Sequence, residues 1–128
     1  MGRVLDVDLN SWEREVLQSD ILTVVDFWHE RCPWCMMLNP ILEEIAVEYE
    51  GRVKFVRFNI LASPDNRQMA LRYGIMSTPT LMFFCAGKPI GGLVGFLSKE
   101  KLKALLDHML EVHRICVRQS SSWEIGIV

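Results

Sequence analysis

The stretch VVDFWHERCPWC, residues 24–35, joins an apolar, β-branched segment to two cysteines three positions apart. When such a pair opens a helix, both side chains lie on one helix face, close enough to form a disulfide. Cys32 then occupies the helix N-terminus, where unpaired N–H groups and the helix dipole favour a thiolate. A thiolate is the attacking species in disulfide exchange, so this position predicts a reactive Cys32. The spacing alone is also typical of zinc sites and structural disulfides, so the surrounding sequence must decide.

Composition indicates one domain with one hydrophobic core, because half of the 128 residues are hydrophobic. The 14 basic and 16 acidic side chains are scattered, with no basic stripe that would indicate nucleic-acid binding. No run approaches the roughly 18 apolar residues of a membrane span, and acidic residues stand where a signal peptide would be apolar. We therefore expect a cytoplasmic protein with no nucleic-acid or membrane partner. In that compartment a close cysteine pair is catalytic or metal-binding more often than structural.

Strand-like and helix-like segments alternate along the chain, which predicts an α/β layer fold. Strands are expected at residues 21–28, 53–59, 80–86 and 90–96, and helices at residues 10–18, 33–49, 64–73 and from 98 onward. Right-handed crossover makes the strands at 21–28 and 53–59 parallel. The short turn at 87–89 makes the last two strands an antiparallel hairpin.

Local signals predict where the helices begin and how they bend. Asn10 with Glu13 three residues later resembles a capping box, and Ser63 with Pro64 resembles an N-cap followed by proline at the first helical position. Pro40 lies inside an expected helix, where it removes one backbone donor and predicts a kink.

Several motifs, in order and spacing, resemble the thioredoxin family over residues 4–112. The motifs are Val25-Asp26-Phe27-Trp28, Pro40-Ile41-Leu42-Glu43-Glu44-Ile45-Ala46, Tyr73-Gly74-Ile75, Thr78-Pro79-Thr80 and Val94-Gly95 with Leu97-Ser98. The resemblance implies a thioredoxin-like three-layer α/β/α fold, with a central mixed sheet and a C-terminal antiparallel hairpin. It also implies a thiol-disulfide oxidoreductase that reduces protein disulfides. We expect residues 1–114 to form this domain and residues 115–128 a flexible tail, with Ser120–Ser122 as a link.

The resemblance makes Cys32 the exposed nucleophile and Cys35 the resolving thiol. Cys32 would attack a substrate disulfide, and Cys35 would then displace the reduced substrate from Cys32. This chemistry needs no cofactor beyond the redox-active Cys32–Cys35 disulfide, and no metal. The implied partners are disulfide-containing client proteins and a thioredoxin-reductase-like or other thiol electron donor. We expect the chain itself to be a monomer.

Asp26 is a charged residue inside an otherwise apolar strand, where burial without a partner is costly and raises a carboxyl pKa. In the resembled family this aspartate lies beneath the cysteines and relays the proton of the resolving thiol. The alternative is a structural ion pair with Arg57, on the expected neighbouring strand. Thioredoxins usually carry lysine at this position, and an arginine would hold Asp26 ionised more firmly.

The resemblance also assigns a substrate-binding rim. Pro79 corresponds to the family's cis-proline opposite the cysteines, which leaves the backbone of Thr78 free to pair with an extended substrate. Gly95 would let that substrate approach closely. The apolar rim around the sulfur comprises Trp28, Trp34, Met76 and Pro79. For Trp28, packing in the core is a second role compatible with the first.

The chain departs from the family between and beside the cysteines. Pro33-Trp34 replaces the common Gly-Pro and resembles the Cys-Pro-aromatic-Cys of glutaredoxins. Arg31 and His29 add possible positive charge, which favours a thiolate, whereas Met36 replaces a common lysine. These departures leave two alternatives to reduction: a disulfide oxidase or isomerase of the same fold, and a non-catalytic module that binds clients.

The other two cysteines receive separate interpretations. Cys85 lies in an apolar strand and is most simply a small buried hydrophobe. Cys116, at the end of the last expected helix, is interpreted as an ordinary free cysteine, with a regulatory or dimer-forming thiol as the alternative. Neither forms a second C-x-x-C, so we expect no four-cysteine zinc site, and His108 and His113 have no evident metal partner.

Overall fold

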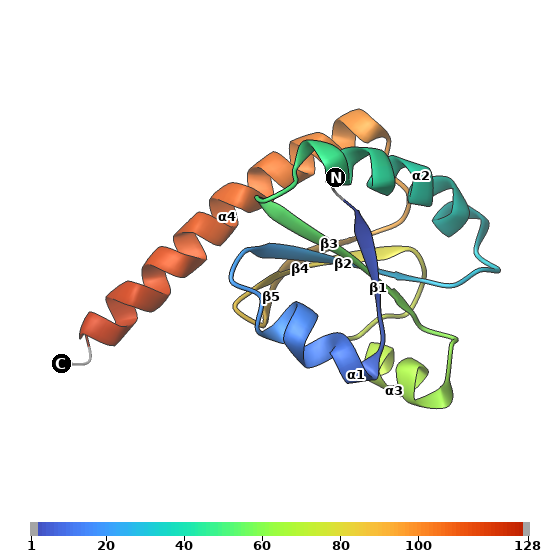
Figure 1. Ribbon diagram of the computed structural model, residues 1–128, viewed down its shortest axis with the longest axis horizontal. Coiled ribbons are helices and arrows are strands. Elements are labelled where there is room, and N and C mark those ends of the chain that lie inside the picture. Colours follow the sequence, from blue (N-terminus) through green and yellow to red (C-terminus); the bar gives the residue numbers. More distant parts are fainter. Residues whose placement is uncertain (1–2, 127–128) are drawn as a thin grey trace.

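The computed structural model describes the backbone of residues 3–126 and the side chains of residues 3–119 (Figure 1). The elements are β1 (Val4–Val7), α1 (Leu9–Trp12), the π-helical turn η1 (Glu13–Leu17), β2 (Leu22–Trp28), α2 (Pro33–Glu48), β3 (Val53–Asn59), α3 (Pro64–Arg72), β4 (Thr80–Cys85), β5 (Lys88–Val94) and α4 (Lys99–Gly126). The strands form one mixed sheet in the order β1-β3-β2-β4-β5. The pairs β1–β3 and β2–β3 are parallel, and β2–β4 and β4–β5 are antiparallel. The expected three-layer α/β/α fold is confirmed.

Helices cover both faces of the sheet and enclose two hydrophobic cores (Figure 1). Alternate residues of β2 enter opposite cores, because strand side chains alternate between faces. Val24 packs with residues of α2 and α4. Val25 and Phe27 pack with residues of α1, η1 and α3. Asp26 follows Val24 by two positions and therefore faces the layer that contains α2, which begins with the cysteine pair.

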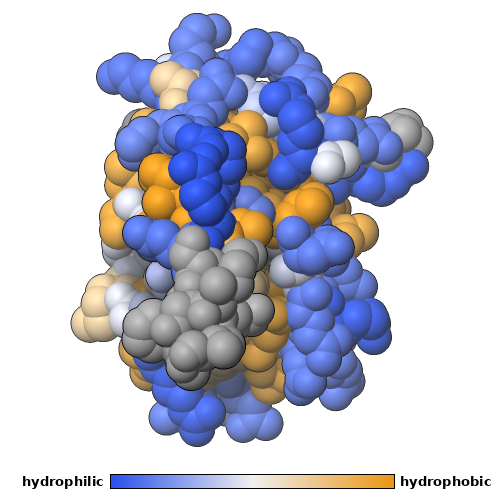
Figure 2. Space-filling model, turned by 90° about the vertical axis from the view of Figure 1, so that its left-hand side faces the viewer, coloured by the Kyte–Doolittle hydropathy of each residue, from blue (hydrophilic) through white to orange (hydrophobic). Residues whose placement is uncertain are grey.

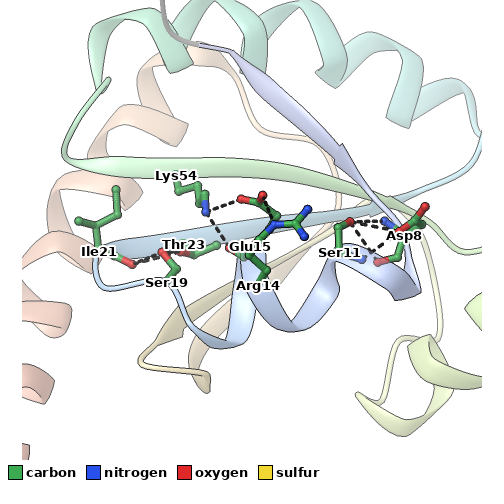
Figure 3. A network of polar contacts seen from close by, with 8 residues as sticks. All are labelled: Asp8, Ser11, Arg14, Glu15, Ser19, Ile21, Thr23 and Lys54. Carbon is green, nitrogen blue, oxygen red and sulfur yellow. Dashed lines mark hydrogen bonds and ion pairs between the residues drawn. The ribbon is translucent and has the colours of Figure 1, made fainter.

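The first helix begins earlier than the sequence predicts, because its cap is Asp8 and not Asn10. The Asp8 carboxylate accepts a hydrogen bond from the Ser11 backbone N–H (3.0 Å), and the Ser11 hydroxyl accepts one from the Asp8 N–H (3.1 Å), as Figure 3 shows. Asp8 has the extended backbone that an N-cap requires. Glu13, the other half of the expected capping box, instead accepts from the Gln18 side chain.

An ion pair fastens η1 to the sheet. Lys54 on β3 lies 2.6 Å from the Glu15 carboxylate and also donates to the Glu15 carbonyl (Figure 3). The hydrogen bond from Lys54 is the main cause that lowers the pKa of Glu15. The pair fixes the segment that leads into β2, and hence the strand that carries Asp26.

The predicted start of α3 and the positions of two prolines in α2 are confirmed. Ser63 accepts a hydrogen bond from the Asn66 N–H at 3.0 Å, and Pro64 is the first residue of α3. Pro33 opens α2, and Pro40 lies inside it.

The hairpin between β4 and β5 is tighter than predicted. Its turn is the two residues Ala86 and Gly87, both with positive φ (50° and 82°), a combination typical of a two-residue hairpin turn. β5 therefore begins at Lys88, before Pro89, and ends at Val94 instead of Phe96. The β4–β5 pairing places β5 at an edge of the sheet, where a proline costs no ladder hydrogen bond with a further strand. Phe96 is thereby left outside the strand.

α4 continues well beyond Arg114, where the helical pattern fades. It runs to Gly126 and includes Ser120–Ser122, where a link was expected (Figure 1). Residues 127 and 128 of the expected tail lie outside the described residues. Among the helices that the structure describes, none combines the length and apolarity needed to cross a bilayer.

A disulfide between Cys85 and Cys116 joins β4 to α4, so the interpretation of Cys116 as a free thiol was wrong. Their Cα atoms are 6.7 Å apart. Cys85 follows Leu81 and Phe83 at alternate positions of β4 and shares their face, which α4 covers. Cys116 follows the buried Met109 by seven residues, or about two helical turns, so both lie on one side of α4.

Candidate active site

Cys32 and Cys35 form a disulfide at the N-terminus of α2, with Cα atoms 5.2 Å apart. Cys32 is the N-cap: its sulfur accepts a hydrogen bond from the Cys35 backbone N–H at 3.2 Å. Pro33 at the next position has no N–H to leave unsatisfied and has a φ suited to the first helical turn. The local sequence thus supplies the dipole and the N–H donor that stabilise a thiolate at Cys32 when the disulfide opens.

The expectation of an exposed nucleophile needs correction. Cys32 is only 6% exposed, because its sulfur turns back onto the helix end and is bonded to Cys35. Cys35 is fully buried. Of the two cysteines in this pair, only Cys32 therefore offers any surface to a second molecule.

Asp26 is a buried carboxyl without a hydrogen-bond partner for either oxygen. Burial raises its pKa to about 7, and the positive charge of Arg57, the smaller of the two causes, opposes this shift. Since its usual pKa is near 3.8, the carboxyl exchanges protons near neutral pH. This property suits a general base or acid more than a permanent charge.

The structural ion pair considered for Asp26 does not form. Arg57 is the register partner of Asp26 on β3, but it is also the register partner of Asp6 on β1. Its guanidinium makes two hydrogen bonds to the Asp6 carboxylate, at 3.1 and 3.3 Å, and lies over the ring of Trp28 at 5.5 Å. The arginine reaches toward the more solvated acid, because a buried ion pair would require both charges to lose water. Trp28 is half-buried beneath it.

A shallow groove of about 340 Å³ lies beside the helix start, lined by Trp34, Thr78, Pro79, Gly95 and Phe96. The Thr78–Pro79 peptide is cis, as the resemblance implied. Gly95 has φ of +109°, which side chains other than glycine rarely adopt, and donates its N–H to the Pro79 carbonyl at 2.8 Å. Apart from its two chain neighbours, no other described residue has an atom within 4 Å of the place where a Cβ would be at Gly95, so the space above it is open.

Trp34 forms one wall of this groove. It is 55% exposed and its ring packs on Phe96 with the centroids 5.6 Å apart. Phe96 is a member of the site that the sequence did not reveal, because it was expected inside a strand. The earlier end of β5 frees it to support Trp34.

A second groove, of about 290 Å³, meets the first at Thr78 and was not predicted. Its lining is mostly apolar and includes Met76, 84% exposed, with His29 and Arg67 as its basic members. Arg67 lies on α3 and His29 directly follows β2, so no local motif links them. Thr78 thus stands between two depressions that an extended chain could follow.

The charged residues around the cysteines are mixed in sign. The Nδ1 atom of His29 accepts from the Arg31 backbone N–H, and Glu30 accepts from the Asn59 side-chain amide at 2.7 Å. That hydrogen bond is the main cause that lowers the pKa of Glu30. Among the described residues, no cluster of three or more His, Cys, Asp or Glu side chains is arranged to hold a metal ion.

A three-layer fold with a reactive cysteine pair at a helix N-terminus, a buried acid and a cis-proline defines a class of thiol-disulfide oxidoreductases. The family model described as Thioredoxin matches residues 3–108. The chain belongs to the thioredoxin family.

Named thioredoxins resemble the chain over most of its length. Thioredoxin 1 from Nostoc sp. is 39% identical over 110 residues, covering 86% of this chain and 100% of that protein. Thioredoxin from Acidithiobacillus ferridurans is 45% identical over 107 residues, covering 84% and 96%. Thioredoxin from Pseudomonas aeruginosa is 38% identical over 104 residues, covering 81% and 94%. The chain is accordingly a thiol-disulfide oxidoreductase with protein-disulfide reductase activity, and its substrates are proteins that contain disulfides.

Proposed function

We propose that the chain acts as a cytoplasmic monomer that reduces client disulfides through Cys32 and is re-reduced by a thioredoxin-reductase-like or other thiol donor. The observation that carries the assignment of roles is the asymmetry of the pair. Cys32 caps α2 and keeps some exposed surface, whereas Cys35 is fully buried. A nucleophile must be reached by the client, and a resolving thiol needs only to reach its neighbour.

In the proposed reaction the Cys32 thiolate attacks one sulfur of the client disulfide. The client's S–S bond breaks, its second sulfur leaves as a thiolate that takes a proton, and a mixed disulfide joins Cys32 to the client. Cys35 then loses its proton and attacks Cys32, which releases the attacked client sulfur as a thiolate that takes a proton and forms the Cys32–Cys35 disulfide. Two electrons pass from the dithiol to the client.

Asp26 is the proposed acceptor of the Cys35 proton. It faces the layer of α2, has no competing hydrogen bond, and has a pKa of about 7. Near neutral pH an ionised fraction is therefore present to take the proton, and the protonated form avoids leaving a charge in the core. Arg57, engaged with Asp6, contributes a positive charge that acts to lower this pKa.

The client is proposed to lie across the groove in an extended conformation. The Thr78 backbone would pair with the client main chain, by the same hydrogen bonding that adds a strand to a sheet. Trp34, Pro79 and Gly95 line this path, and Met76 extends the apolar rim into the second groove. Half-buried Trp28 would support the rim from below.

The test is reduction of insulin disulfides driven by dithiothreitol, with the wild-type chain, Cys32→Ser and Cys35→Ser. We expect the wild type to accelerate precipitation of the insulin B chain, and both variants to lose turnover. Met109→Leu, a volume-conserving change in α4, is the control and should keep wild-type rates. Wild-type rates in Cys32→Ser, or no acceleration by the wild type, would contradict the proposal.

A further inference from the structure

The two disulfides lie at opposite ends of β4. Pro79, which lines the groove at the cysteine pair, immediately precedes this strand, and Cys85 is its last residue. Six residues of extended chain separate the two positions, which corresponds to about 20 Å. Because the two pairs lie at opposite ends of this strand, we infer that exchange between them takes place between molecules.

Burial holds only the first part of α4 on the sheet. Leu102, Leu106 and Met109 are buried in the core shared with α2. Among the described side chains beyond Met109 none is buried, although Leu110 and Val112 still pack against that core. Figure 1 shows the C-terminal half of α4 extending away from the sheet. The disulfide to Cys85 is therefore the main restraint on this part of the helix.

On the face of the molecule toward which α4 extends, hydrophilic and hydrophobic side chains are interspersed (Figure 2). Ile115 and Val117, which flank Cys116, are both exposed. No large apolar burial thus compensates for loss of the covalent bond, and segments with few buried contacts open locally at low cost in free energy.

The two cysteine residues differ in exposure, as those of the catalytic pair do. Cys85 is buried at the end of β4, whereas Cys116 on α4 is partly exposed. An incoming thiolate therefore reaches Cys116, and Cys85 is the leaving thiol.

We propose that Cys85–Cys116 is a second redox site, a disulfide latch on α4 that a dithiol of another protein molecule opens by attack on Cys116. The reduced Cys32–Cys35 pair of a second copy is one such dithiol. Its thiolate bonds to Cys116 as the Cys85–Cys116 bond breaks, and Cys85 takes up a proton. The second thiol of the reductant then loses its proton and displaces Cys116, so the reductant becomes a disulfide and the latch becomes two thiols. The reverse reaction with a disulfide closes it.

The experiment uses the full chain as the Cys32→Ser/Cys35→Ser variant, in which Cys85 and Cys116 are the remaining cysteines. The reductant is the ¹⁵N-labelled wild-type chain in its reduced form. Acid quenching, alkylation and mass spectrometry follow the thiols, and hydrogen exchange follows the backbone. We expect no free thiol in the oxidised variant, then release of two thiols under native conditions, and exchange at least about tenfold faster for amides of residues 110–126 alone.

Three outcomes would overturn the proposal: free Cys85 and Cys116 after air oxidation, a disulfide that opens only in denaturant, or faster exchange spread evenly over the sheet. The second result would identify a permanent structural cross-link. Labelled Cys35→Ser donor should form a mixed disulfide with Cys116, and attachment to Cys85 would contradict the assigned order of attack. Should the double variant fail to fold, stepwise reduction of the wild-type chain by dithiothreitol gives the same readouts.

Discussion

The Cys32–Cys35 and Cys85–Cys116 disulfides differ in what surrounds them more than in their chemistry. The first closes a separation of three residues at a helix N-terminus, beside a groove and in the helical layer that the buried Asp26 faces. The second spans 31 residues and joins an edge of the core to a helix that burial leaves partly free. Local proximity with stabilisation of a thiolate is suited to catalysis, whereas a long covalent loop is suited to restraining the fold.

The largest expected difference between the two disulfides is in client reduction. Cys32→Ser should lower the rate of insulin reduction at least about a thousandfold, because without the nucleophile no mixed disulfide forms. Cys116→Ser should leave this rate within about twofold of wild type. Comparable losses in the two variants would show that both pairs belong to one catalytic site.

Asp26 gives the next largest effect, on the free energy of unfolding as a function of pH. Its native pKa of about 7 exceeds the ordinary value of 3.8, so the native state binds the proton more tightly than the unfolded state. Stability from this group is complete below about pH 4 and is lost as pH rises through 7. By this linkage, Asp26→Asn should gain up to about 4 kcal/mol relative to wild type at pH 8.

Denaturant unfolding of both proteins at pH 4 and pH 8 measures the Asp26 effect, with both disulfides oxidised. The same variant should reduce insulin more slowly, because the Cys35 proton lacks its acceptor. Asp6→Asn, at the exposed partner of Arg57, is the matched control and should show a small, pH-independent change in stability. An equal gain for Asp26→Asn at both pH values would argue against a titrating buried carboxyl.

The two disulfides should rank in the opposite order in their contributions to the free energy of unfolding, with Cys85–Cys116 contributing more than Cys32–Cys35. The loop-entropy relation gives about 3.5 kcal/mol for the 31-residue separation of Cys85 and Cys116, and about 1.5 kcal/mol for the separation of three. Urea midpoints of the oxidised Cys85→Ala/Cys116→Ala and Cys32→Ala/Cys35→Ala variants test this order. A larger loss in the second variant would show that the catalytic disulfide is the stronger restraint.

The smallest predicted effect concerns client binding. Trp34→Ala should raise the KM for a disulfide-containing protein about five- to tenfold with little change in kcat, because an aromatic wall of the groove is lost. Ile115→Ala, at an exposed apolar residue beside Cys116, should leave KM unchanged. Equal shifts in KM would place client contacts at both ends of the molecule.

Sequence reasoning succeeded where one local signal determines the structure. β3 is found at residues 53–59 as predicted, and Ser63 with Pro64 opens α3, because apolar pattern and cap chemistry act within a few residues. The Asp8 cap was missed because Asp8 and Asn10 lie close together in the sequence and both have side chains that can cap a helix.

What the sequence left open at Asp26 and what it missed at Cys116 have a non-local cause. Whether Arg57 pairs with Asp26 or Asp6 depends on strand order, since β3 lies between the strands that carry both acids. To predict the Cys85–Cys116 bond, one must know both that Cys85 lies on the face of β4 covered by α4 and that Cys116 lies two helical turns beyond Met109. The second groove joins residues from separate elements, so it follows only from the folded chain.

The most direct test of the assigned chemistry is to trap the reaction between the full-length Cys35→Ser variant and insulin, and to map the attachment by mass spectrometry. We expect an accumulating mixed disulfide in which insulin is attached to Cys32 and to no other cysteine of the chain. Attachment of insulin to Cys116, or no covalent adduct under conditions where the wild type turns over, would contradict the assignment of Cys32 as the nucleophile.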